Sequence, residues 1–372
     1  MRRAGRQGNP NTVRRLVPAM LVAIACQGAS GADDVVDPRI QTASVFDGVH
    51  LQWFKDQEQA WKDDPNRAVV QGPYIITGTG QVAQASVRLP VAPDDRSTGI
   101  KGIIRVEPVP SEDGSGTPGD PWTRLGSIVV LDDMGQPVEL IRFVTGFGGT
   151  STYEADLTAF APLLSGERTF RATLSSFSQP GWKLWFELVY YPDTAGARRP
   201  HMVQALFMEP EIEAGSGLIR KRVRIPRGLS RPRIRLISTG HGSQKGDEFI
   251  SRTHVLRVDG QEVLRFRPWS EHGAGVRGLN PWSGRLIIDG REIWASDFDR
   301  SGWAPGLMVQ PLVAPMPELG PGTHVIELEI LGLQAPPPGA PGNFWSVSAC
   351  ILADQPWPAP RGSDLQDALE SP

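Results

Sequence analysis

Cysteine is almost absent from this sequence: its 372 residues include two, Cys26 and Cys350. Cys26 lies in an N-terminal segment with the features of an export signal, so Cys350 has no intramolecular partner whichever way that signal is processed. The protein must therefore be stable without a disulfide, which favours large cores over a small cross-linked fold. Because Cys350 lies in the apolar run 347–352, we expect a buried, unreactive thiol.

A long apolar segment is also missing from the N-terminus. The apolar stretch 16–25 has about ten residues, whereas a membrane-spanning helix needs about twenty. It follows a basic region and precedes Ser30-Gly31-Ala32, a small-residue cleavage site, so residues 1–32 predict a signal peptide, an exported protein and no transmembrane segment. Residues 22–26 also resemble a bacterial lipobox that ends at Cys26, so secretion and a lipid anchor at Cys26 both remain open.

Several signals of specific partners or chemistry are absent. Charged residues make up 21% of the chain and the formal net charge is −3, so the composition gives no sign of a polyanion partner, and we do not expect nucleic acid as a ligand. His241, His254 and His272 do not belong to any pair spaced by two or four residues, so we expect neither a metal site nor a cofactor. The sequence contains no GxSxG elbow and no phosphate loop.

Turn-forming residues are abundant, with 41 Gly and 34 Pro, and the apolar pattern from about residue 80 onward has the two-residue period or the short runs of strands. We therefore predict an all-β fold. The predicted strands cover 127–131, 138–144, 169–174, 183–190, 233–237, 254–258, 262–266, 324–330 and 345–352. Asp259-Gly260 tolerates positive φ and predicts a tight hairpin. Short helical turns are expected at 57–63 and 157–164.

The length and composition favour two domains. The polar stretch 193–200 is the best internal boundary, so we expect a signal at 1–32, an extension with the first strands at 33–95, one sandwich at 96–195 and another at 200–353. The extension could form an extra layer or cover a cleft. Residues 354–372 are rich in Pro and polar residues and predict a disordered tail. We expect a monomer.

Several motifs resemble the peptide-N-glycosidase F family. In the second predicted domain they are Arg252-Thr253-His254, the stretch from Arg300 to Trp303 and Pro305-Gly306, in the expected order. In the first domain, 120–131, 141–147, 154–170 and 185–191 are similar to the family's N-terminal domain. The resemblance covers about residues 100–353. It implies two side-by-side, eight-stranded antiparallel jelly rolls with an active cleft between them, a pair also found in copper-dependent peptide hydroxylating monooxygenases.

The resemblance implies hydrolysis of the amide that joins an N-glycan to asparagine, which requires carboxylates as acid and base. Glu248 lies where the family has a cleft glutamate; its other reading is a solvated loop acid. The family's main catalytic aspartate falls on Thr123, which cannot transfer protons near neutral pH, and a second family glutamate falls near Thr173. Asp120 is the candidate replacement, with a turn residue as the alternative.

Trp122, Arg124, Arg300 and Trp303 match positions in or near the family's sugar-binding cleft. An indole face packs on a sugar ring and a guanidinium donates to hydroxyl groups, although Trp303 could equally be a core residue and Arg300 a structural ion pair with Asp297 or Asp299. Two functions follow. One is an exported amidase that acts on N-glycans or glycopeptides, and the other is a non-catalytic relative that binds glycans.

Overall fold

The computed structural model describes residues 37, 39–90, 98–193, 199–214, 217–242, 246–288, 290–333, 335 and 342–354. The chain divides into two compact units, Met1–Asp37 and Pro38–Pro372, and the fold below belongs to the second. The predicted signal peptide, Cys26 and all of the predicted tail except Asp354 lie outside the described residues. Among the described residues, no helix has the length and apolar character needed to cross a bilayer.

The first sandwich consists of two antiparallel sheets. One has the order β1-β10-β5-β8 and the other β2-β3-β4-β9-β6-β7. Their strands are β1 (Gln41–Leu51), β2 (Val69–Gln71), β3 (Tyr74–Thr77), β4 (Val82–Leu89), β5 (Thr98–Pro108), β6 (Leu125–Leu131), β7 (Pro137–Val144), β8 (Ser151–Asp156), β9 (Gly166–Leu174) and β10 (Trp182–Pro192). Both β1 and β4 lie within the predicted extension, so this part of the chain supplies strands to both sheets.

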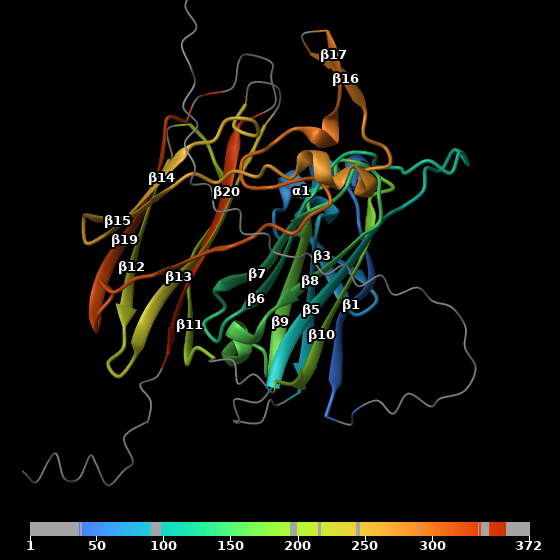
Figure 1. Ribbon diagram of the computed structural model, residues 1–372. Helices are drawn as coiled ribbons and strands as arrows, with labels where there is room; N and C mark the ends of the chain where they lie inside the picture. The colour runs from blue at the N-terminus through green and yellow to red at the C-terminus, as the bar shows by residue number, and fades with distance from the viewer. Residues whose placement is uncertain are drawn as a thin grey trace, which may run out of the picture. The chain divides into compact units, whose positions relative to one another are not determined.

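The second sandwich repeats this arrangement with the orders β11-β20-β13-β18 and β12-β19-β14-β15. Its strands are β11 (Met202–Ile212), β12 (Leu218–Ile225), β13 (Ser230–His241), β14 (Thr253–Val258), β15 (Gln261–Phe266), β18 (Leu312–Pro315), β19 (Gly322–Leu331) and β20 (Phe344–Asp354). A separate hairpin, β16 (Arg285–Ile288) and β17 (Arg291–Trp294), extends from the segment between β15 and β18 (Figure 1).

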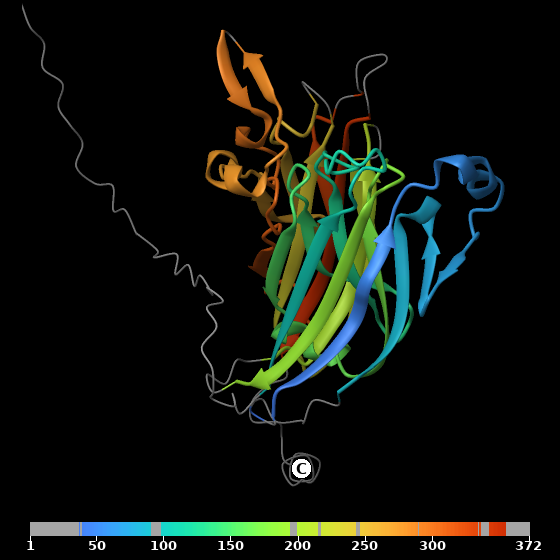
Figure 2. The same ribbon diagram turned by 90° about the vertical axis from the view of Figure 1, so that its right-hand side faces the viewer.

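In the first sandwich β1 pairs with β10 and β4 with β9, and in the second β11 pairs with β20 and β12 with β19, which is the jelly-roll order. Helices are short: α1 (Glu58–Asp63) and the 3₁₀ turns η1 (Lys55–Gln57), η2 (Gly78–Gly80), η3 (Thr158–Leu163), η4 (Gly273–Leu279) and η5 (Ala295–Asp297). The prediction of an all-β, antiparallel jelly-roll fold is confirmed. Figure 2 shows α1 with β2 and β3 beside the longer strands of the first sandwich.

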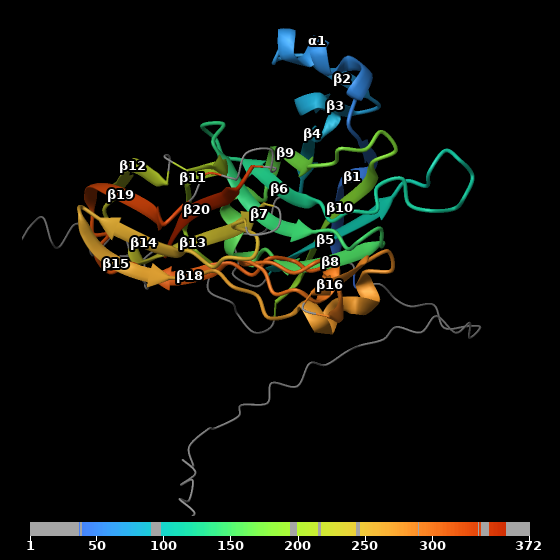
Figure 3. The same cartoon turned by 90° about the horizontal axis from the view of Figure 1, so that it is seen from above.

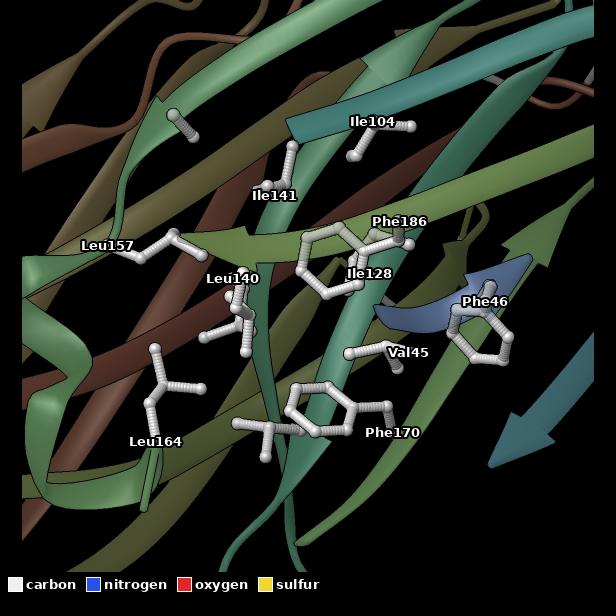
Figure 4. Packing of buried hydrophobic residues seen from close by; sticks show 14 of the residues in the cluster. Val45, Phe46, Ile104, Ile128, Leu140, Ile141, Leu157, Leu164, Phe170 and Phe186 are labelled. Carbon is white, nitrogen blue, oxygen red and sulfur yellow. The ribbon is translucent and has the colours of Figure 1, made fainter. Parts of the chain in front are cut away.

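Each sandwich is held together by side chains that alternate along its strands. In β10, buried and less buried residues alternate from Trp182 to Tyr190, as expected for a strand with one face on the core. Figure 4 shows how Phe46, Ile104, Phe170 and Phe186 of the first core come from strands of both sheets. A second cluster, which includes Leu256, Trp345 and Val347, fills the other sandwich. Cys350 is 3% exposed, so the expected buried thiol is confirmed, and burial raises its pKa to about 11.

The two sandwiches lie side by side, with β7 at their junction (Figure 3). Every residue of β7 from Val138 to Val144 is buried, although β7 ends the order of its own sheet. Its edge is covered by residues 306–309: Gly306 N donates to Val144 O at 3.0 Å and Val309 N donates to Arg142 O at 2.8 Å. Backbone pairing between sandwiches thus satisfies an edge that would otherwise be open.

A buried polar network crosses the same junction. Arg142 pairs with Glu139 through two hydrogen bonds of 2.9 and 2.7 Å and donates across the junction to Thr239 Oγ1 at 3.1 Å and to Ser346 O at 2.5 Å. Arg235 donates to Glu139 O and Leu140 O at 2.9 and 2.8 Å. Because buried charges are costly unless paired and hydrogen-bonded, this network fixes the alignment of the sandwiches.

Candidate functional site

The site in the first sandwich is a loop held by Asp120, just before β6. Asp120 is 0% exposed and accepts from Arg124 Nε and Nη2, both at 2.8 Å. Ser176 Oγ donates to Asp120 Oδ2 at 2.7 Å, Trp182 Nε1 donates to it at 3.1 Å, and Trp122 N donates to Oδ1 at 3.4 Å. Five donors therefore surround one carboxylate, which ties this loop to β10 and to the loop after β9.

This bonding bears on the prediction that Asp120 replaces the family's catalytic aspartate. A general acid or base must reach the substrate or a water molecule with an oxygen atom that is free to exchange a proton. Both oxygens of Asp120 are occupied by Arg124 and its other donors, and the side chain has no access to solvent. The arrangement is that of a turn residue that organises its loop.

Trp122 points outward from the loop that Asp120 holds. Its side chain is 62% exposed, and its ring lies 6.5 Å from that of Phe147 at 62°. Nearby, Arg124 lies 5.2 Å over the ring of Phe177, which is 61% exposed and makes an edge contact with Trp53 at 6.1 Å. The first sandwich therefore presents an exposed aromatic surface, defined by Trp53, Trp122 and Phe177, with the Arg124 guanidinium beside it and the buried ring of Phe147 against Trp122.

The site in the second sandwich is centred on Glu248 and Arg300. Arg300 Nε donates to Glu248 Oε1 at 2.9 Å, while Nη1 and Nη2 donate to Phe298 O and Ala295 O, both at 2.7 Å. The Glu248 side chain is 19% exposed and that of Arg300 is 3% exposed. Burial raises the pKa of Glu248 above its ordinary value, while Arg300 and the backbone of Gly242 partly oppose this shift.

Trp303 belongs to the core beside this pair. Its ring is 4% exposed, its Nε1 donates to Gly240 O at 2.8 Å, and it stacks on His241 at 5.5 Å. The Arg300 guanidinium carbon also lies over the Trp303 ring, 4.9 Å from its centroid. The alternative of a packed tryptophan fits this geometry. The ion pair of Arg300 is with Glu248, and Asp297 instead pairs with Arg277.

The structure thus gathers the six candidate residues into two groups. Among the described residues, no hydrogen bond or ion pair joins Asp120, Trp122 or Arg124 to Glu248, Arg300 or Trp303. The groups meet through a small apolar cluster at the junction, in which Trp303 packs with Val144, and Leu125, the neighbour of Arg124, packs against it. Thr123 and Thr173, where the family has acids, are both partly buried and carry no charge.

The buried histidines are neutral members of hydrogen-bond networks. His254 Nδ1 donates to Arg252 O at 3.1 Å, so Nε2 accepts from Ser238 Oγ at 2.9 Å. Burial lowers the pKa of His254 to about 4 and that of His241 to about 3. Within the part of the chain that the structure describes, no three His, Cys, Asp or Glu side chains converge as metal ligands would.

Sequence reasoning missed the other members of the aromatic surface and the partners of Asp120. Phe177 lies in the loop after β9, and Phe147, the buried ring that Trp122 contacts, lies in the loop after β7, where neither spacing nor periodicity marks a binding residue. Ser176 and Trp182 are distant from Asp120 in sequence. The one available signal was the Trp53 side chain in the extension, a large aromatic outside any strand pattern.

Comparisons with known proteins agree with the fold. The family model described as Peptide-N-glycosidase F, C terminal, matches residues 214–352. A structure of PNGF-II is similar with a TM-score of 0.71 and 20% identity over 87% of this chain, which spans 66% of the PNGF-II chain. The structure of PNGase F, a glycosylasparaginase from Flavobacterium meningosepticum, is similar with a TM-score of 0.61 and 18% identity, over 85% of this chain and 96% of that one.

None of the curated protein sequences matches the chain. The similarity to solved structures is at low sequence identity, so it supports the fold alone. The family model supports the assignment of the second sandwich. The resemblance inferred from the motifs around Arg252, Arg300 and Pro305 is confirmed. Residues 214–352 thus match the C-terminal domain of the peptide-N-glycosidase F family, and the fold of the chain is similar to that of the solved PNGase F and PNGF-II structures.

Proposed function

We propose that this protein recognises N-glycans or glycopeptides through the exposed aromatic surface and does not use the family's two-carboxylate amide hydrolysis. The observation that carries the proposal is Trp122, a 62% exposed indole on a loop fixed by a fully buried carboxylate. Exposed large aromatics are costly in water, and an indole face packs well against the apolar face of a sugar ring. A rigid loop lowers the entropy that binding would otherwise cost.

The second part of the proposal concerns the missing proton-transfer groups. Hydrolysis of a glycosylasparagine amide needs a base that activates water and an acid that protonates the leaving nitrogen. Thr123 and Thr173 supply neither, and Asp120 is occupied by Arg124 and by its other donors. Glu248 is the remaining acid of the predicted site. Loss of one positioned proton-transfer group typically lowers a rate by about 10²–10⁴.

A second candidate function is hydrolysis in which Glu248 alone transfers protons. Its raised pKa and its partly exposed side chain favour this role, because a carboxylic acid with a pKa nearer to neutrality is a better general acid. Arg300 would then keep the carboxylate in one orientation through its Nε. The substrate would be an N-glycan amide or a related glycoconjugate amide.

One experiment separates the two. The mature protein is incubated with a denatured N-glycoprotein and released glycan is measured, with Glu248→Gln as control. In parallel, binding of a glycopeptide and of the same peptide without glycan is measured for the wild type, for Trp122→Ala and for the control Met134→Ala, which removes an exposed side chain at the other end of β6. The proposal predicts no release, and glycan-dependent binding that Trp122→Ala weakens. Release that Glu248→Gln abolishes would select the hydrolase.

The proposal includes export of the chain, because a glycoprotein partner is met outside the cytoplasm. Support comes from the basic and apolar pattern of residues 1–32, which are not among the described residues. Secretion and a lipid anchor at Cys26 predict different products. Mass spectrometry of the mature N-terminus would give Asp33 in the first case and a lipid-modified Cys26 in the second.

A further inference from the structure

The second sandwich has a surface cavity of about 550 Å³ between residues 266–272, which follow β15, and residues 302–312, which lead into β18. Small-molecule sites commonly have volumes of about 300–1,000 Å³. Of the six candidate residues, Trp303 lines this cavity, while Glu248 and Trp122 do not. The cavity is therefore separate from the exposed aromatic surface around Trp122.

Both walls of the cavity are fixed by backbone hydrogen bonds. On one side, Ser270 and Arg300 exchange two backbone bonds of 2.9 and 3.2 Å, and Ser251 Oγ donates to Pro268 O at 3.2 Å. On the other side, Gly306 and Val309 pair with β7 of the first sandwich. The cavity is thus formed before any ligand arrives, which is the usual state of a binding site for small molecules.

The lining combines an aromatic ring with polar groups that have no partner. Trp269 is 39% exposed, and Glu271, His272 and Gln310 are exposed. Over the described ranges, none of these four side chains makes a hydrogen bond or an ion pair. Together they offer an indole N–H donor, a carboxylate acceptor, an imidazole and an amide in the lining of one cavity. Groups of this kind orient a ligand once an apolar surface has bound it.

From this arrangement we infer that the cavity binds a single neutral sugar residue, independently of the proposed function of the aromatic surface. The indole of Trp269 packs on the apolar face of the sugar ring, and Glu271 and Gln310 accept from and donate to its hydroxyl or acetamido groups. Arg267 and Glu271 carry opposite charges in the lining, so the cavity has no excess of one sign that would select an ionic ligand.

The test uses the mature protein with N-acetylglucosamine, methyl α-mannoside and galactose, each at millimolar concentration, and measures saturation transfer by NMR followed by titration. At least one sugar should bind. Trp269→Ala should weaken binding at least tenfold, Trp269→Phe should retain most of it, and Glu271→Gln should weaken it less than Trp269→Ala does. Trp282→Ala, in which an indole that is 47% exposed and outside the cavity is removed, is the matched control and should bind as the wild type does.

The outcomes separate this inference from the function proposed above. Binding that is lost in Trp269→Ala but kept in Trp122→Ala supports the cavity. Binding that is lost only in Trp122→Ala overturns the cavity and supports the aromatic surface. Failure of all three sugars to bind overturns the inference, whatever the glycopeptide result. Because Trp269 is partly exposed and lies outside the core clusters, an unchanged unfolding midpoint of the variants is expected and checks that they fold.

Discussion

Replacement of Asp120 by asparagine should destabilise the protein strongly, because Asp120 holds its loop together. The change removes the charge that pairs with Arg124, and it turns one acceptor oxygen into a donor that faces Arg124, Ser176 or Trp182. Loss of one partner from a buried ion pair costs about 3–5 kcal/mol. Because 13% of the Arg124 side chain is exposed and so partly solvated, the cost of losing the ion pair falls to about 3 kcal/mol. Each buried donor that loses its acceptor oxygen adds about 1 kcal/mol.

The expected loss is therefore about 3–5 kcal/mol out of a total that is typically 5–15 kcal/mol. Urea unfolding followed by near-UV circular dichroism measures it, and a double-mutant cycle with Arg124→Gln should give a coupling above about 1 kcal/mol. Asp113→Asn, which changes an exposed turn acid in the preceding loop, is the control and should shift the midpoint far less. A wild-type midpoint for Asp120→Asn, together with loss of any hydrolytic activity, would show that Asp120 transfers protons and would refute the structural role.

Three further changes test other parts of the fold by urea unfolding. Arg142→Met leaves Glu139 buried without its paired cation and should lower the free energy of unfolding by about 3–5 kcal/mol. The loss should be smaller when Glu139→Gln is added, and an unchanged midpoint would contradict a stabilising junction network. The folded pKa values of His254 and His241, about 4 and 3, lie below the ordinary 6.5. The stability that each neutral histidine contributes is therefore complete above pH 6.5 and falls by about 1.4 kcal/mol per pH unit below it. His254→Gln should make stability fall less steeply with pH, and an unchanged slope would contradict a buried, neutral His254. Gly260→Ala forces a side chain into φ +82° and should cost about 1–2 kcal/mol, which a wild-type midpoint would disprove.

The fold class could be predicted because short-range signals were sufficient for it. The alternation in 183–190 and the apolar run 345–352 fall within β10 and β20, and Asp259-Gly260 forms the predicted hairpin with φ values of 50° and 82°. The expected turns at 57–63 and 157–164 became α1 and the 3₁₀ turn η3. Each of these depends on residues that are neighbours in the chain.

The strands β1, β8 and β11 were not predicted, for a physical reason. In β8 the alternation is regular but only six residues long and rich in polar residues, and β11 contains a proline and two bulges in its pairing with β20. β1 and β11 pair with β10 and β20, whose own patterns predict strands, while β8 pairs with β5, which the pattern did not predict either. Tertiary context decides such segments, so sequence alone gives a weak signal.

The site could be predicted in part. Glu248 and Arg300 are close because the segment between β13 and β14 contacts the segment before β18. The order of the motifs in the sequence, compared with that of the family, was sufficient to select both residues as candidates. The bonding of Asp120 was beyond reach, because its partners Ser176 and Trp182 approach it only when β9 and β10 are assembled. Burial changes the role of a carboxylate, and burial is a property of the assembled sandwich.

Residues that match cleft positions of the family therefore differ in how much they say about chemistry. Arg300 has a structural role, because its guanidinium donates to the carbonyls of Ala295 and Phe298, and Trp303 is buried in the core with its Nε1 bonded to Gly240 O. Trp122 is different: it makes one exposed edge contact and contributes little to packing, so stability does not explain an indole there. Trp122 is moreover not isolated, because the exposed ring of Phe177 lies on the same surface, and grouped exposed aromatics favour a binding surface over a chance surface residue; the proposed glycan-binding role therefore depends on Trp122 rather than on the better bonded Arg300 or Asp120.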